Sequence, residues 1–99
     1  MSQNEPKQVI VVGAGLGGIS TAISLAQKGY RVEMFEKNGQ IGGKLNVLTE
    51  RGYSFDLGPS ILTLPHLFER LFTDGGRKMS DYIPIRKLRP HWRNFFDAG

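Results

Sequence analysis

The stretch that decides the fold is QVIVVGAGLGGISTAISLAQ, residues 8–27. Its first part, Val9 to Val12, is a wholly apolar and β-branched run, which is typical of a strand buried on both faces. From about Leu16 the apolar residues take helical spacing and form one stripe, made of Ile19, Ala22, Ile23 and Ala26. Gly29 then supplies the left-handed position that closes a helix. The stretch therefore predicts a strand, a glycine-rich turn and a helix.

The same stretch carries no charge and is long enough to span a bilayer. Because Lys7 precedes it, the stretch also resembles the apolar part of a signal peptide. Four glycines stand at its centre, and each costs a helix about 1 kcal/mol relative to alanine. The glycines therefore favour a division into a strand and a helix over a single membrane-spanning helix.

Residues 31–35 have Val32, Met34 and Phe35 as their apolar members, and we interpret them as a second strand. A strand, a helix and a second strand within the first 36 residues make one βαβ unit, and a right-handed crossover makes its two strands parallel.

The turn between the first strand and the helix contains the pattern GxGxxG at Gly13, Gly15 and Gly18. In this setting the first glycine permits a tight turn, the second lets the backbone approach a pyrophosphate, and the third lets the helix pack against the strand. The phosphates are expected on the free N–H groups and positive end of the helix that starts near Leu16.

Glu36 ends the second strand, where a carboxylate accepts hydrogen bonds from the hydroxyl pair of a ribose. A 2′-phosphate would be repelled there, which disfavours NADP, although Lys37 next to it weakens that exclusion. The alternative is a surface acid at a strand end. Up to this point the pattern fits NAD and FAD equally.

After five further residues come Gly42, Gly43 and Lys44. With this glycine pair, the run from Val9 to Lys44 resembles the extended dinucleotide-binding motif of the flavoproteins that include amine oxidases, protoporphyrinogen oxidases and phytoene desaturases. The usual last residue of that motif is arginine. Lys44 keeps the positive charge without the planar fork, so a one-point phosphate contact is expected.

The segment GYSFDLGPSILTLP, residues 52–65, is similar to the corresponding segment of bacterial carotenoid desaturases and oxidases, and the tail from Met79 is similar to the start of their substrate region. The resemblance implies an FAD enzyme of several hundred residues, the parent protein, of which this chain is an N-terminal fragment that is inactive alone. It also implies that Gly58, Pro59 and Ser60 approach the flavin ring.

The implied chemistry is transfer of hydride equivalents from a polyene to the flavin, with oxidation of a terminal methyl group of a diapocarotenoid of the diaponeurosporene type. Alternatives are a carotenoid desaturase, a flavin enzyme acting on an amine or porphyrinogen, and a non-catalytic NAD-linked module. No catalytic residue is assigned. The candidate FAD-binding residues are Gly13, Ala14, Gly15, Leu16, Gly17, Gly18, Glu36, Lys37, Gly43, Lys44, Gly58, Pro59 and Ser60.

The predicted fold class is α/β: the N-terminal βαβ of a Rossmann-like FAD-binding domain, followed by β-hairpins and a short helix, with the domain incomplete. KLNVLT and YSFDL predict one hairpin, HLFERLF predicts a helix after Pro65, and IPIRKL and WRNFF are two more extended pieces. We divide the chain into a flexible arm (1–7), the N-terminal part of the FAD-binding domain (8–60) and the start of the substrate region (61–99).

The formal charge of +4 is concentrated in the last third, where aromatic residues are interspersed among the basic ones. No nucleic-acid motif accompanies them, so no nucleic-acid partner is expected. An anionic membrane surface is a candidate partner of the parent, because a carotenoid substrate resides in the bilayer. This places the parent in the cytoplasm, peripherally on the inner face of the membrane, with its oligomeric state undetermined. The absence of cysteine and the presence of only two separated histidines predict no metal site.

Overall fold

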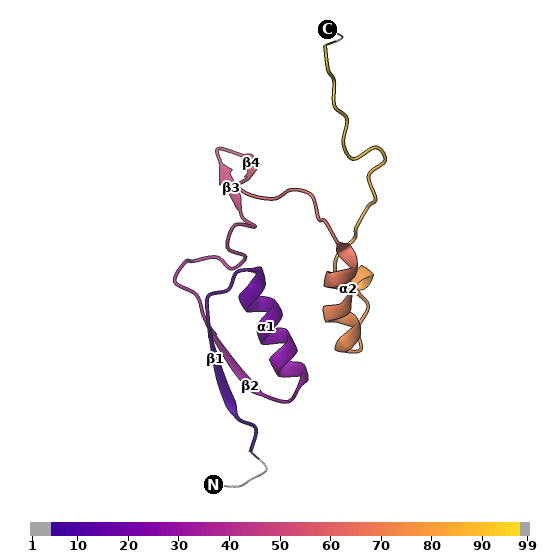
Figure 1. Cartoon of the computed structure of the whole chain (residues 1–99). Coiled ribbons are helices and arrows are strands. Elements are labelled where there is room, and N and C mark those ends of the chain that lie inside the picture. The colour runs from indigo at the N-terminus through magenta and orange to yellow at the C-terminus, as the bar shows by residue number, and fades with distance from the viewer. Residues whose placement is uncertain (1–4, 98–99) are drawn as a thin grey trace.

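The structure, a computed structural model, describes residues 5–97, so the first four residues of the expected arm lie outside the described residues (Figure 1). The elements in chain order are β1 (Gln8–Val12), α1 (Leu16–Gln27), β2 (Arg31–Phe35), β3 (Val47–Glu50), β4 (Tyr53–Asp56), α2 (Pro65–Asp74) and the short 3-10 helix η1 (Met79–Asp81).

The first three elements form the expected βαβ unit. β1 pairs in parallel with β2, from Gln8 opposite Arg31 to Val12 opposite Phe35, and α1 packs against both strands. Gly29 follows α1 at φ +88°, in the left-handed region, as expected. The uncharged stretch is therefore divided between a strand and a helix. Among residues 5–97, no helix has the length and apolar character needed to cross a membrane.

The expectation that the first strand is buried on both faces is wrong for this chain. Val11 lies against Gly18 of α1, whereas Ile10 and Val12 on the opposite face are 58% and 84% exposed. The physical reason is that α1 covers one face of the sheet, and a doubly wound sheet needs a second layer of helices on the other. No such layer is present among the described residues.

The second sheet is the hairpin predicted between residues 44 and 57. β3 and β4 pair antiparallel, from Val47 opposite Asp56 to Glu50 opposite Tyr53. Its two loop residues, Arg51 and Gly52, both have positive φ, at 50° and 83°. This is the backbone of a type I′ turn, whose twist matches that of the strands it joins.

The prediction of more than one hairpin is wrong for residues 5–97, in which β3 and β4 form the one hairpin. Residues 83–97 contain no strand, although IPIRKL and WRNFF were expected to be extended pieces of a second pair. Pro84 and Pro90 each lack the N–H that a ladder requires. The apolar side chains of this tail are exposed, so the tail has no surface on which a sheet would be stabilised.

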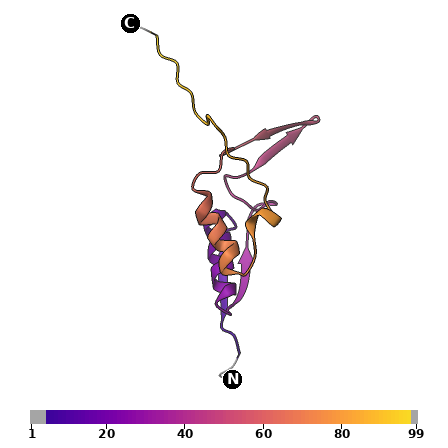
Figure 2. The same ribbon diagram turned by 90° about the vertical axis from the view of Figure 1, so that its right-hand side faces the viewer.

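Helix α2 begins at Pro65 as predicted and lies beside α1, as both views show (Figures 1 and 2). The hairpin projects from the end of the molecule where both helices begin. Among the described residues only the apolar side chains of Ala14 and Met79 are buried. The fold is therefore an open assembly around the glycine-rich turn, with its extents measuring 73 × 32 × 29 Å.

Candidate functional site

The glycine-rich turn brings β1, β2 and α1 together at one end of the sheet. The N–H of Gly13 donates to the carbonyl of Phe35 at 2.7 Å, which joins the turn to the end of β2. A Cβ placed on Gly18 would lie 1.9 Å from the carbonyl oxygen of Gly13. A side chain at position 18 would therefore push the helix off the turn, which is the close packing expected of the third glycine.

The N-terminus of α1 is open toward solvent and carries no acid in its first turn. Gly15 is its N-cap residue and provides no side-chain cap, and the first backbone bond of the helix runs from the N–H of Ile19 to the carbonyl of Gly15 at 2.9 Å. Leu16 and Gly17 are exposed, and a Cβ on Gly17 would meet nothing within 4 Å. The first N–H groups and the positive end of the helix dipole are thus accessible to an anion.

The carboxylate of Glu36 is fixed beside this turn by two backbone amides. Its Oε1 accepts from the N–H of Ala14 at 3.0 Å, and its Oε2 accepts from the N–H of Asn38 at 2.8 Å. These bonds, that to Asn38 first, lower the pKa of Glu36 below its ordinary value. The group is therefore ionised at neutral pH and presents the remaining lone pairs of a half-buried carboxylate to hydroxyl donors.

A second glycine loop closes onto the first. The N–H of Gly42 donates to the carbonyl of Ala14 at 2.7 Å, and Gly42 forms an isolated parallel bridge with Gly15. Gly43 has φ +62°, and a Cβ there would lie 3.2 Å from the Cα of Gly15. Side chains are thereby kept out of the space between the two loops, so backbone alone borders it.

The segment after the hairpin returns to the same place. A Cβ on Gly58 would lie 1.9 Å from the carbonyl oxygen of Lys44, so residue 58 is packed against the end of the second glycine loop. Pro59 and Ser60 follow it and are exposed. Lys37 and Lys44 are exposed as well. Lys37 directly follows Glu36, and Lys44 directly follows the second glycine loop.

The structure thus brings the candidate residues from 13 to 58 into one region at the end of the sheet. Two contributors to this region are absent from the sequence-based set. Gly42 is recognisable from its place in the glycine pair. Asn38 acts through its backbone N–H, which no residue type signals, so only its position two residues after the acid could have pointed to it.

The residues fit the phosphate and ribose groups of a dinucleotide. An uncapped helix N-terminus suits a pyrophosphate, loops without side chains allow close approach, and an ionised carboxylate suits a ribose diol. Within residues 5–97, no three histidine, cysteine or acidic side chains are grouped as a metal site would require.

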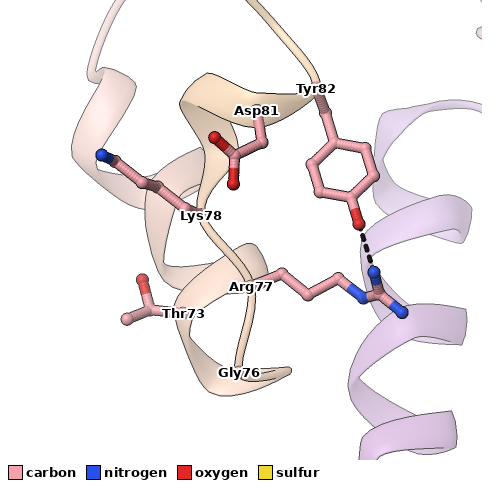
Figure 3. A pocket seen from close by; sticks show the side chains of 6 residues that line it. All are labelled: Thr73, Gly76, Arg77, Lys78, Asp81 and Tyr82. Atoms are coloured by element: carbon pink, nitrogen blue, oxygen red, sulfur yellow. Dashed lines mark hydrogen bonds between the residues drawn. The ribbon is translucent and has the colours of Figure 1, made fainter.

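A separate hollow lies between the C-terminal end of α2 and η1 (Figure 3). Its lining residues are Thr73, Gly76, Arg77, Lys78, Asp81 and Tyr82. Arg77 donates to the hydroxyl of Tyr82, and the Tyr82 ring also packs on Phe72 of α2 with a centroid distance of 5.4 Å. This cluster holds η1 against α2 and shares no residue with the glycine loops.

The family model that matches the chain is the NAD(P)-binding Rossmann-like domain, over residues 11–74. The 4,4'-diapolycopene oxygenase of Methylomonas sp is 60% identical over 99 residues, which are 100% of this chain and 20% of that protein. The 4,4'-diaponeurosporene oxygenase of Staphylococcus aureus (strain USA300) is 54% identical over 93 residues, 94% of this chain and 19% of that protein.

The chain spans about a fifth of the length of these curated relatives. Their names confirm the resemblance to carotenoid oxidases that the segments after Lys44 indicated. The family match covers the turn, the acid, the second glycine loop and α2. The chain belongs to the NAD(P)-binding Rossmann-like domain family, and the geometry of its glycine loops and acid is that of a site for a dinucleotide cofactor.

Proposed function

We propose that this chain is the nucleotide-binding N-terminal part of an FAD-dependent oxidase that acts on a terminal methyl group of a diapocarotenoid. The observation that carries the proposal is the identity of 60% and 54% to oxygenases named for diapolycopene and diaponeurosporene, over nearly the whole of this chain. The parent protein performs the reaction, and the 99 residues supply part of its cofactor site.

The second glycine loop supports FAD as the dinucleotide. A site for NAD needs only the first glycine loop and the acid, and this chain has both. Beyond these, Gly42 and Gly43 contact Gly15 and add a second stretch of backbone without side chains. The family resemblance assigns this stretch to the phosphates of the flavin nucleotide. Lys44 follows it with an exposed ammonium group that provides a point-charge contact to a phosphate.

In this proposal the residues of the chain bind and orient. The N–H groups at the start of α1 hold the pyrophosphate, and Glu36 accepts hydrogen bonds from the ribose hydroxyls. The segment from Gly58 to Ser60, packed beside Lys44, approaches the flavin ring. FAD, when bound, would supply the redox chemistry of the oxidation, and the residues of this chain would hold its nucleotide part.

The proposal extends to where the parent works. Arg86, Lys87, Arg89 and Arg93 lie in the described tail with Asp97 as its one acid after Tyr82, and Trp92 is 71% exposed. Basic and aromatic side chains together favour an anionic bilayer surface, so we place the parent at the cytoplasmic face of the membrane. Co-sedimentation with anionic and neutral vesicles tests this, and equal binding to both would remove the electrostatic contribution.

The reaction is tested by the mass spectrum of pigments from a diapocarotenoid-producing host that expresses the parent gene. A product that gains oxygen supports the oxidase. A product that only loses hydrogens assigns the parent to the desaturases, which share the resemblance of residues 52–65. An unchanged pigment contradicts both and favours another flavin substrate, such as an amine.

A further inference from the structure

One side chain joins α1 to α2. Gln27, the last residue of α1, donates from Nε2 to the carbonyl oxygen of Leu71 at 2.8 Å. The last four carbonyls of a helix have no partner within it. The carbonyls of Phe72 and Thr73 accept from N–H groups of residues 75–77, and Leu71 accepts from Gln27. The bond thus gives a helix-end carbonyl its partner and ties the two helices together.

The residue opposite Gln27 leaves room for it. A Cβ on Gly75 would lie 2.8 Å from the Gln27 Nε2 and 3.5 Å from the carbonyl oxygen of Phe72. The φ of Gly75 is −90°, which any residue adopts, so the backbone conformation does not require glycine there. A Cβ at position 75 would therefore displace the amide at the flexible end of Gln27 and break its bond to the Leu71 carbonyl.

Helix α2 is connected to the dinucleotide site by residues 58–64, which we term the strap. At one end Gly58 packs against the Lys44 carbonyl. At the other end Leu64 has φ +52°, directly before Pro65. A left-handed leucine is strained and persists only where the surrounding structure holds it. Figure 1 shows the strap crossing from the hairpin to the start of α2, at the same end of the molecule as the glycine loops.

We infer that Gln27 is a positioning residue: by fixing α2 on α1 it holds the strap, and with it Pro59 and Ser60, at a defined place beside the dinucleotide site. The contact of the strap with the flavin ring rests on the proposed function, whereas the positioning of the strap does not. Because Gln27 is at the opposite end of α1 from the phosphate-binding N–H groups, it acts on the strap without touching the cofactor.

The test uses the purified parent holoenzyme and five variants. Gln27→Glu keeps the size of the side chain but removes the N–H donor, and Gly75→Ala displaces the amide. The third variant is Gln27→Ala, and the fourth combines it with Gly75→Ala. The control is Gln8→Ala, which removes an exposed amide that donates to Glu33 Oε2 at 2.9 Å on the sheet. The readouts are the flavin absorption spectrum, the Kd for FAD, and kcat and KM for the diapocarotenoid.

Gln27→Glu and Gly75→Ala are expected to raise KM roughly three- to tenfold and to alter the flavin spectrum, with the Kd for FAD within about twofold of wild type. The double variant should be no worse than Gln27→Ala alone, because the truncated residue 27 leaves room for alanine at 75. Variants that match Gln8→Ala, a parallel loss of FAD affinity, or additive effects in the double variant would each overturn the inference.

Hydrogen exchange of the strap and α2 separates this inference from the proposed function. Faster exchange at residues 61–72 in the Gln27 and Gly75 variants, relative to Gln8→Ala, supports positioning even if the wild-type parent holds no flavin or oxidises no carotenoid. Unchanged exchange contradicts positioning even if the wild type is a carotenoid oxidase.

Discussion

At the scale of single residues, Glu36 has a structural role in addition to the ribose contact expected of it. Its position after the second strand, a little over twenty residues beyond Gly13, was enough to predict the acid. Its two backbone partners were not predictable, because amides of Ala14 and Asn38 carry no signal in their side chains. The carboxylate therefore joins the glycine turn to the segment after β2 before any cofactor binds.

This double role predicts that Glu36→Gln weakens the binding of the dinucleotide by the parent protein. The amide retains one acceptor oxygen and sets an NH₂ group against a backbone N–H, so the Kd for the dinucleotide should rise roughly tenfold or more at pH 7. Isothermal titration calorimetry measures it. A Kd unchanged by the substitution would contradict the ribose contact.

The stability effect of the same substitution follows from the lowered pKa. The folded-state pKa of Glu36 lies below its ordinary value of 4.5. Between these two pKa values the unfolded state binds more protons than the folded state, so the free energy of unfolding rises with pH across that range. The ionised carboxylate stabilises the fold above pH 4.5, and this contribution is lost as the pH falls through the folded-state pKa. Thermal melts of wild type and Glu36→Gln should therefore differ at pH 7 and converge on acidification. A constant difference would show that the carboxylate does not titrate as argued.

The glycine pair at positions 17 and 18 gives a matched test of the turn. Gly18→Ala should destabilise the parent by about 1–3 kcal/mol, because its Cβ overlaps the Gly13 carbonyl. Gly17→Ala meets nothing within 4 Å and should be neutral or stabilising by up to about 1 kcal/mol. Urea unfolding of the two variants checks this, and equal effects would contradict the close packing at Gly18.

At the scale of elements, the strands and helices with local signals were predictable and those that need distant partners were not. The period change at Leu16 and the proline at position 65 mark α1 and α2 correctly. The tail pieces after Ile83 have extended character, but a strand forms only where another strand pairs with it, and residues 5–97 offer none. The bond between Gln27 and Leu71 spans 44 positions and has no signature in either residue.

The hairpin turn provides a prediction at this scale. Arg51 occupies a left-handed position at φ 50° that asparagine adopts at lower cost. Arg51→Asn should stabilise the parent by about 1 kcal/mol, while Gly52→Ala, at φ 83°, should destabilise it by a similar amount or more. Thermal unfolding measures both. A destabilising Arg51→Asn would mean that the arginine side chain makes a contact in the parent that outweighs its backbone strain.

At the scale of the whole molecule, the described residues lack a core. A compact domain of about 100 residues has a radius of gyration of about 13 Å, whereas this chain has 18.6 Å. The exposed apolar residues lie mainly on the uncovered sheet face, the hairpin and the tail. The sequence pattern of β1 predicts burial on both faces, and we propose that the further length of the parent, whose relatives are about five times as long as this chain, covers the second face.

The uncovered sheet face leads to a prediction for Ile10→Lys, which should be favourable in the isolated 99 residues and unfavourable in the parent. Ile10 and Val12 are exposed here at 58% and 84%, so Ile10→Lys should increase the monomer fraction of the isolated 99 residues, as measured by sedimentation velocity. In the parent the same lysine would be buried against the second layer and should destabilise the fold by about 3 kcal/mol or more. Gln8→Lys adds an equal charge on the same face, but at the first residue of β1, and serves as the control for both the isolated residues and the parent. A parent that tolerates Ile10→Lys as well as Gln8→Lys would show that this face stays in solvent, and the apolar run of β1 would then need another explanation than a doubly wound sheet.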